Sequence, residues 1–213
     1  NAEGSFLPIT ITAPEGSILN PRHPASTGAR GMMGHLLPPA IFGALAQVIP
    51  EKVQAAPGSP SNSFQISNAG TGDPWVLIGF VGAGQGASLE RAGTSAISFP
   101  SNLSNSPIEA IESLSPFQVT KREIRRDSGG SGKQRGGNGI AFEMILRGDE
   151  PATASVIMNR TRSQAPGLDG ADDGALALLR VNGETVDSAD HQTLRPGDTL
   201  LIASGGGGGF GSA

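Results

Sequence analysis

The chain has 213 residues, a formal net charge of −4 and no cysteine. The absence of cysteine excludes disulfides, thiolate zinc sites and cysteine nucleophiles, and the negative charge argues against nucleic acid as a partner. The 32 glycines and 16 prolines favour frequent turns and short strands over long helices.

The N-terminal part of the sequence predicts one strand followed by an interrupted helix. Residues 6–13 alternate and are rich in Ile and Thr, which is typical of a strand. Apolar residues then recur at helical spacing over 27–48, with Pro38 and Pro39 in the middle. Because proline clashes inside a helix, we expect two helical pieces, or one kinked helix, broken near Leu37.

The middle of the chain predicts short strands separated by loops. Residues 55–63 are rich in Pro, Ser and Gly, so we expect a mobile loop there, and a subdivision of the domain would fall in this segment. Short strands are expected at 64–68, 74–81 and 94–99, and a flexible glycine-rich turn at 82–88.

A short helix is predicted at residues 107–113, in a setting rich in polar side chains. Ser106 would be its N-cap, Pro107 its first residue and Glu109 its third, an arrangement that satisfies free amides at a helix start. Two asparagine amides, Asn102 and Asn105, stand just before it. Such asparagines either cap turns or contact a substrate.

The C-terminal half predicts a meander of short antiparallel strands. These strands are expected at 117–126, 139–147, 152–160, 175–181 and 199–204. Asn182-Gly183 indicates a type I′ hairpin, and the run Arg195-Pro-Gly-Asp indicates a turn before the last strand. We therefore expect an α+β, β-rich fold of short, mostly antiparallel strands, with one or two helices near the N-terminus, in a single domain over 1–213.

Two glycine-rich segments bring the backbone unusually close to something bulky, or turn it at positive φ. Residues 128–139 carry six glycines around Arg135. The guanidinium of Arg135 could form a buried ion pair or donate bidentate hydrogen bonds to a carboxylate or phosphate. Their neighbour is either a ligand or another part of the protein. Gly205–Gly209 would form an anion-binding nest, a loose tail or a tight chain crossing.

Metal and membrane functions find little support in the residues. The histidines His23, His35 and His191 are far apart and lack carboxylates at metal-ligand spacing, so we expect no metal site made by this chain alone. No apolar run approaches the roughly 20 residues that span a bilayer, and no signal peptide opens the chain, so we expect a cytoplasmic protein.

The same residues, in the same order, resemble the C-terminal part of the hydantoinase B/oxoprolinase family, which includes the large subunit of acetone carboxylase. Residues 102–112 are similar to its Asn-Thr-x-Asn-Thr-Pro-x-Glu-x-x-Glu segment, and 125–139 to its Arg-x-x-Ser-Gly-Gly-x-Gly-x-x-Arg-Gly-Gly-x-Gly segment. The resemblance spans nearly the whole chain. One departure is that Phe99 or Pro100 stands where the family often has a histidine.

The resemblance implies ATP-dependent chemistry on a cyclic amide, opening a hydantoin, oxoproline or related lactam through a phosphorylated intermediate. The alternative within the family is a subunit of a ketone carboxylase of the acetone carboxylase type. An alternative of another class is a non-catalytic module that holds such a complex together. Asn102, Asn105, Glu109 and Arg135 are the candidate substrate contacts, and the sequence assigns no catalytic residue.

The resemblance also implies partners. Family members are longer than this chain, and an N-terminal portion with histidine and carboxylate metal ligands is missing from it. We therefore expect this chain to be inactive alone and to bind no cofactor by itself. ATP and a divalent metal would bind to that portion or to an actin-like, hydantoinase A-type subunit, in a hetero-oligomer that acts on a small molecule.

Overall fold

The computed structural model describes residues 10–28, 30–60, 62–68 and 72–212. The chain divides into two compact units, Asn1–Gly34 and His35–Ala213, and helix α1 (Arg30–Leu45) crosses from one to the other. This division lies before residues 55–63, where the sequence suggested a boundary. The single domain expected over 1–213 stays a prediction.

Nine strands, two α-helices and one 3-10 helix make up the regular structure of the described residues. After α1 come the 3-10 helix η2 (Pro50–Lys52), β1 (Asn62–Asn68), β2 (Val76–Val81), α2 (Ile108–Leu114), β3 (Phe117–Ile124), β4 (Ile140–Leu146), β5 (Ala152–Ile157), β6 (Leu178–Val181), β7 (Glu184–Thr185), β8 (Gln192–Leu194) and β9 (Thr199–Ala203). The expected α+β, β-rich fold with a helix near the N-terminus is confirmed.

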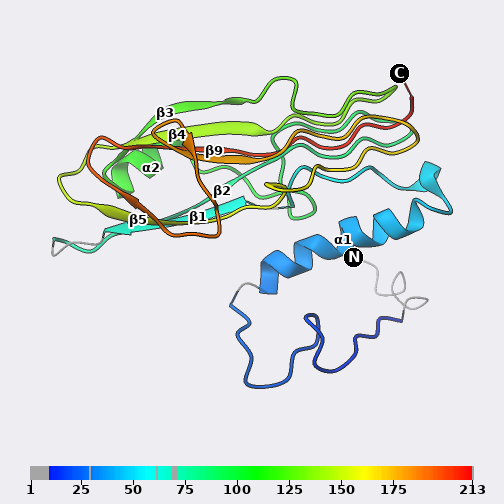
Figure 1. Ribbon diagram of the computed structural model, residues 1–213, viewed down its shortest axis with the longest axis horizontal. Coiled ribbons are helices and arrows are strands. Elements are labelled where there is room, and N and C mark those ends of the chain that lie inside the picture. Colours follow the sequence, from blue (N-terminus) through cyan, green and yellow to red (C-terminus); the bar gives the residue numbers. More distant parts are fainter. Residues whose placement is uncertain (1–9, 29, 61, 69–71, 213) are drawn as a thin grey trace. The chain divides into compact units, whose positions relative to one another are not determined.

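The strands form two antiparallel sheets that face each other (Figure 1). One sheet has the order β2-β1-β5-β8 and the other β3-β4-β9-β6-β7. Every second residue of β4 is buried, and its Phe142 stacks on Phe64 of β1 with ring centroids 5.8 Å apart. The core therefore lies between the sheets, where Ile66, Met144, Leu200 and Ile202 are fully buried.

The predicted C-terminal meander is wrong in its connectivity. Strand β5 leaves β4 and pairs with β1 and β8 in the other sheet, so β4 is followed in its own sheet by β9. Two facing sheets bury the inner faces of their central strands, which a single sheet of alternating strands cannot do by itself. The predicted turns are correct: Asn182 and Gly183 both have positive φ, as a type I′ hairpin requires.

The N-terminal predictions fare less well. Of the two alternatives for the helix, the structure has the single one: α1 continues through Pro38 and Pro39, because the prolines remove only the bonds toward Gly34 and His35. The strand expected at 6–13 lies partly outside the described residues, and 10–13 form no strand. None of the described helices combines the length and apolarity needed to cross a membrane.

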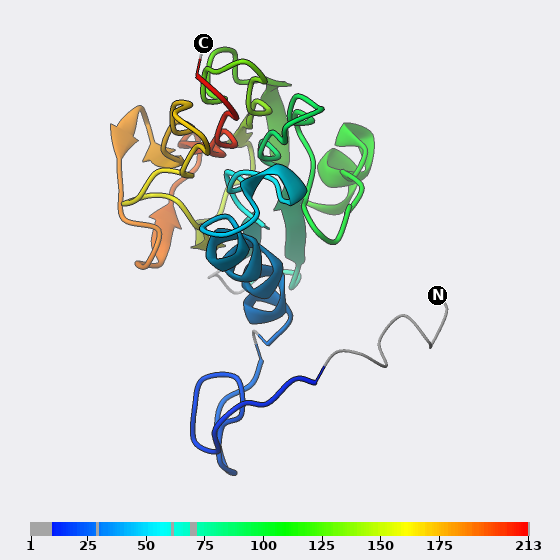
Figure 2. The same cartoon turned by 90° about the vertical axis from the view of Figure 1, so that its right-hand side faces the viewer.

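Beyond the sheets, six segments, four of them rich in glycine, lie side by side as extended chains outside any sheet (Figures 1 and 2). We call them the glycine bundle, and they are 55–58, 82–88, 93–96, 128–139, 165–175 and 204–211. Residues 55–63 and 82–88 were predicted as a mobile loop and a flexible turn. The described residues of both are instead largely buried, and their backbones hydrogen-bond to each other and to the rest of the bundle.

Residues 204–211 are the central chain of the glycine bundle. The amides of Gly207, Gly208 and Gly209 donate to the carbonyls of Gly137, Ala56 and Asp172 at 3.0, 2.9 and 3.0 Å. A Cβ on most of these glycines would overlap the backbone of a neighbouring segment, so the glycines are required by close approach. The prediction of a tight chain crossing is confirmed. The alternative of an anion-binding nest is wrong, because these amides already donate to protein carbonyls.

Candidate functional site

The four predicted substrate contacts do not form one cluster. Asn102 has a positive φ of 53° and is exposed, and Glu109 is exposed in the first turn of α2. Asn105 lines a small pocket. Arg135 lies in the glycine bundle, where it pairs with Asp127 at 2.7 Å with 48% of its side chain exposed. That pair is exposed, not buried, and the substrate-binding role of all four stays a prediction.

The start of α2 differs from its prediction. Pro107 is the N-cap, with ψ of 144°, and no side chain caps the helix. Because Pro107 is extended, Ser106 lies outside the helix and cannot reach its amides. The Ser106 carbonyl instead accepts a hydrogen bond of 2.6 Å from the Arg122 guanidinium of β3. This contact anchors the asparagine-rich segment to the sheet.

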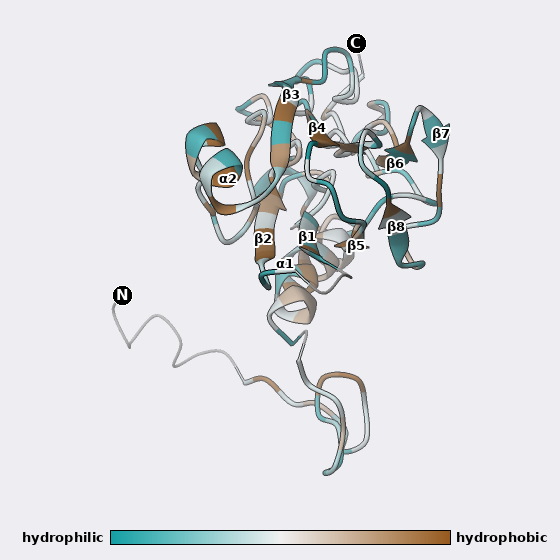
Figure 3. Cartoon of the chain, turned by 90° about the vertical axis from the view of Figure 1, so that its left-hand side faces the viewer, coloured by the Kyte–Doolittle hydropathy of each residue, from teal (hydrophilic) through white to brown (hydrophobic). Residues whose placement is uncertain are grey.

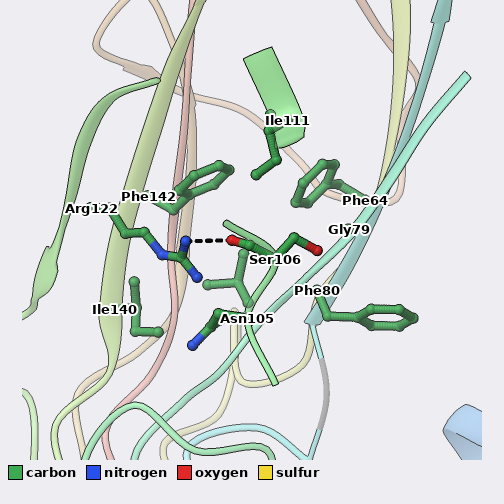
Figure 4. Close-up of a pocket in the computed structure, with 10 residues that line it drawn as sticks. Phe64, Gly79, Phe80, Asn105, Ser106, Ile111, Arg122, Ile140 and Phe142 are labelled. Atoms are coloured by element: carbon green, nitrogen blue, oxygen red, sulfur yellow. Dashed lines mark hydrogen bonds between the residues drawn. The ribbon is translucent and has the colours of Figure 1, made fainter. Parts of the chain in front are cut away.

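The pocket beside Asn105 is apolar and too small for a lactam (Figure 4). Its volume is about 10 Å³, which is about the space that one water molecule occupies. Figure 4 shows the Arg122–Ser106 hydrogen bond on one side and the Phe64 and Phe142 rings on the other. The aromatic rings and Ile111 belong to the core, so this pocket is a packing gap at the edge of the two sheets.

A second cavity is an open cleft of about 450 Å³, within the usual size range for small-molecule sites. Two segments form its walls, 51–54 and 88–91, and the aromatic residues Phe42 and Phe99 complete the lining. The walls are joined by a backbone hydrogen bond of 2.7 Å from Ala55 to Ala87. We call this cavity the charged cleft.

The lining of the charged cleft carries both positively and negatively charged side chains. Its lining includes Glu51, Lys52, Glu90 and Arg91. Below them, the Gln85 amide donates to the Gln54 carbonyl oxygen at 2.9 Å. A cyclic amide presents both an N–H and a C=O, so a lining with cations and carboxylates can bind either edge. Sequence reasoning missed the cleft, although Glu90-Arg91 are charged residues flanked by two glycine-rich segments.

Phe99 occupies a position of interest at this cleft. It is one of two positions where the resemblance places a family histidine, and its ring lies 6.3 Å from that of Phe42. Phenylalanine cannot accept or donate a proton, so this wall of the cleft is apolar. Among the described residues, no three His, Cys, Asp or Glu side chains are placed to hold a metal ion.

Arg125 is half-buried and links separate segments of the chain, a role that the sequence did not predict for it. Its guanidinium donates to the carbonyls of Leu176 and Ser204, the latter at 3.1 Å, and so connects the end of β3 to Leu176 and to the first residue of the bundle segment 204–211. Burial lowers the pKa of Arg125, with a smaller contribution from the nearby Arg180 charge. The signal available in the sequence was the position of this arginine just before the glycine-rich segment 128–139. Its contacts give Arg125 a structural role.

Comparison with known proteins confirms the resemblance. The family model described as hydantoinase B/oxoprolinase matches residues 1–213. A protein of Pseudomonas sp. strain NS671, provisionally named as the B-type subunit of a D-/L-hydantoinase, is 30% identical over 98% of this chain and 36% of its own length. The chain thus spans little more than a third of that relative.

Two solved structures share the fold. The ATP-dependent caprolactamase of Pseudomonas jessenii matches with a TM-score of 0.68 and 26% identity, over 79% of this chain and 32% of its own. The nucleotide-free acetone carboxylase matches with a TM-score of 0.62 and 21% identity, over 82% of this chain and 29% of its own, which shows the fold alone. With the family model covering the whole sequence, the chain belongs to the hydantoinase B/oxoprolinase family.

Proposed function

We propose that this chain is the C-terminal portion of the B-type part of an ATP-dependent enzyme that opens a cyclic amide, such as a hydantoin, 5-oxoproline or a related lactam. The observation that carries the proposal is the likeness to the ATP-dependent caprolactamase, with a TM-score of 0.68 over 79% of this chain. The hydantoinase-type relative supports the same substrate class.

The proposed chemistry has three steps. ATP first transfers its γ-phosphate to the oxygen of the ring amide, which converts a poor leaving group into a good one. Water then adds to the ring carbon and the C–N bond breaks, which leaves a free amine and an acyl phosphate. A second water attacks the acyl carbon, and phosphate departs with the oxygen that came from the amide. ATP and a divalent metal would bind outside this chain, on its N-terminal portion or on a hydantoinase A-type partner. This chain would supply part of the substrate-binding wall.

The test uses the full-length protein together with its ATP-binding companion, purified from the source organism. Hydantoin, 5-oxoproline and caprolactam are each offered with ATP, and release of ADP and of the opened amino acid is measured. We expect equal amounts of both, and ¹⁸O from a labelled ring carbonyl in the released phosphate. ATP use that depends on acetone and bicarbonate would instead identify a ketone carboxylase, and no ATP use with any substrate would favour an assembly module.

We further propose that the charged cleft contacts the ring substrate, because its volume of about 450 Å³ has room for a lactam and its lining carries cations and carboxylates. Arg91→Ala in the full-length enzyme should raise KM at least about tenfold, since a charge-assisted hydrogen bond is lost. The matched control is Arg147→Ala, which removes an exposed arginine outside the cleft. Equal KM values for the two variants would exclude the cleft as a substrate contact.

A further inference from the structure

Helix α1 is apolar all round and none of its residues is buried. Arg30 and His35 are its only ionisable residues, while Leu37, Ile41 and Leu45 are 38%, 54% and 40% exposed. Figure 3 shows α1 in pale brown and white, whereas α2 alternates between teal and brown. The same lack of burial extends over the described residues from Thr10 to Lys52.

A helix with this composition is not stable in water. Amphipathic surface helices carry a polar face, whereas helices that are apolar on every side occur where other structure surrounds them. The sequence of α1 offers little compensation, because it contains two prolines and three glycines, at Gly31, Gly34 and Gly43. A Cβ on any of these glycines would meet nothing within 4 Å, so the space around them is open in this chain.

We propose that α1 is the docking element for the portion of the B-type polypeptide that lies outside this chain in its relatives. This rests on the family assignment and not on which ring the enzyme opens. The chain accounts for 36% of the hydantoinase-type relative and 32% of the caprolactamase chain, so most of each relative lies outside the matched region. A surface this free of charge resembles a domain core cut in half, as permanent interfaces do.

Two other occupants fit the observations less well. A separable ATP-binding subunit would dock through a surface with a polar rim, whereas α1 has almost no charged residue along its 16 residues. A second copy of this chain could pair α1 with α1 along one side only. Such pairing would leave the remaining sides of an all-round apolar helix in water.

Hydrogen exchange tests the proposal without any activity assay. Amide exchange over residues 30–48 is followed in this 213-residue chain and in the full-length protein. We expect exchange in the full-length protein to be slower by at least about a hundredfold, because the surrounding structure must open first. Equal rates would overturn the proposal. So would protection that appears only at high concentration of this chain, or only when the ATP-binding subunit is added.

A pair of substitutions gives a second, independent readout. Ile41→Asp should lower the melting temperature of the full-length protein but leave that of this chain unchanged, because the side chain is exposed only in the latter. The control is Ile124→Asp at the end of β3, where the isoleucine is 52% exposed. If Ile41→Asp prevents folding of the full-length protein, the milder Ile41→Ala should give the same difference. A loss that is equal in both proteins contradicts the proposal.

Discussion

At Gly207 the central chain of the glycine bundle passes directly over the backbone of Gln85. A Cβ there would overlap the Gln85 carbonyl, and both sides of the contact are backbone, which cannot move aside. Gly207→Ala should therefore destabilise the protein by about 3 kcal/mol, at the upper end of what overpacked cores lose. Urea unfolding measures the change. Gly43→Ala is the control because nothing lies within 4 Å of its Cβ, and an equal loss in the two variants would refute the expectation.

Ser204 satisfies two backbone groups at the point where β9 leads into the bundle. Its hydroxyl donates to the Gly82 carbonyl at 2.6 Å and accepts from the Ile140 amide at 2.7 Å, and the residue is fully buried. Ser204→Ala leaves both partners unpaired, so we expect a loss of about 2 kcal/mol. Ser113→Ala removes an exposed hydroxyl that donates to Ala110, and should change stability by less than about 0.5 kcal/mol. Thermal unfolding of both variants measures the two losses, and equal losses would contradict the role given to Ser204.

Local patterns identified residues but not their partners. The glycines of 128–139 predicted close approach of backbone, yet the approaching segment is 204–211, far along the chain. Arg135 and Arg125 look alike in sequence, but one is exposed beside Asp127 and the other is half-buried beneath two carbonyls. Nothing in the spacing of a single segment encodes such long-range neighbours. The parts of the candidate site that depend on contacts between distant segments were therefore the least predictable.

At the scale of elements, alternation and turn chemistry predicted most strands well. β4 and β9 alternate buried and less buried residues, and Asn182-Gly183 fixes a hairpin whatever surrounds it. Strands β7 and β8 escaped prediction because they have only two and three residues, too few for a period to show. The pairing of β5 with β1 escaped because sheet partners are chosen by packing between the two sheets.

The turn before β9 should make a pH-dependent contribution to stability. The Asp198 carboxylate accepts hydrogen bonds from the Arg195 amide at 2.7 Å and the Asn182 side chain at 2.8 Å. These bonds, the Arg195 amide first, lower the pKa of Asp198 below 3.8. A lowered folded-state pKa means that the stabilisation is present above 3.8 and disappears as the pH falls through the lower folded value.

Asp198→Asn should consequently lower the urea midpoint at neutral pH and matter less and less below about pH 4. Because the carboxylate is exposed, the loss at neutral pH should stay below about 1 kcal/mol. Asp190→Asn is the comparison, since that carboxylate accepts no hydrogen bond from the described residues. A difference from wild type that stays constant from about pH 7 to about pH 2 would contradict this assignment.

At the scale of the whole molecule, the unit His35–Ala213 depends on its final segment. Residues 204–211 hydrogen-bond to four of the other five bundle segments. Removal of 204–213 should therefore abolish cooperative thermal unfolding, whereas removal of a loose tail would leave it unchanged. Removal of 1–28 is the contrasting truncation, because the described residues of that stretch include none that is buried. Loss of cooperativity in both truncations, or in neither, would contradict this view of the bundle.

The central place of residues 204–211 also sets an order of events during synthesis. A ribosome delivers the chain from the N-terminus, so this segment emerges after the other five that surround it. Until then, four of those five segments expose backbone amides and carbonyls whose partners in 204–211 have not yet been synthesised. The bundle therefore cannot close before residues 204–211 have left the ribosome, and the nascent chain must be kept from aggregating until then.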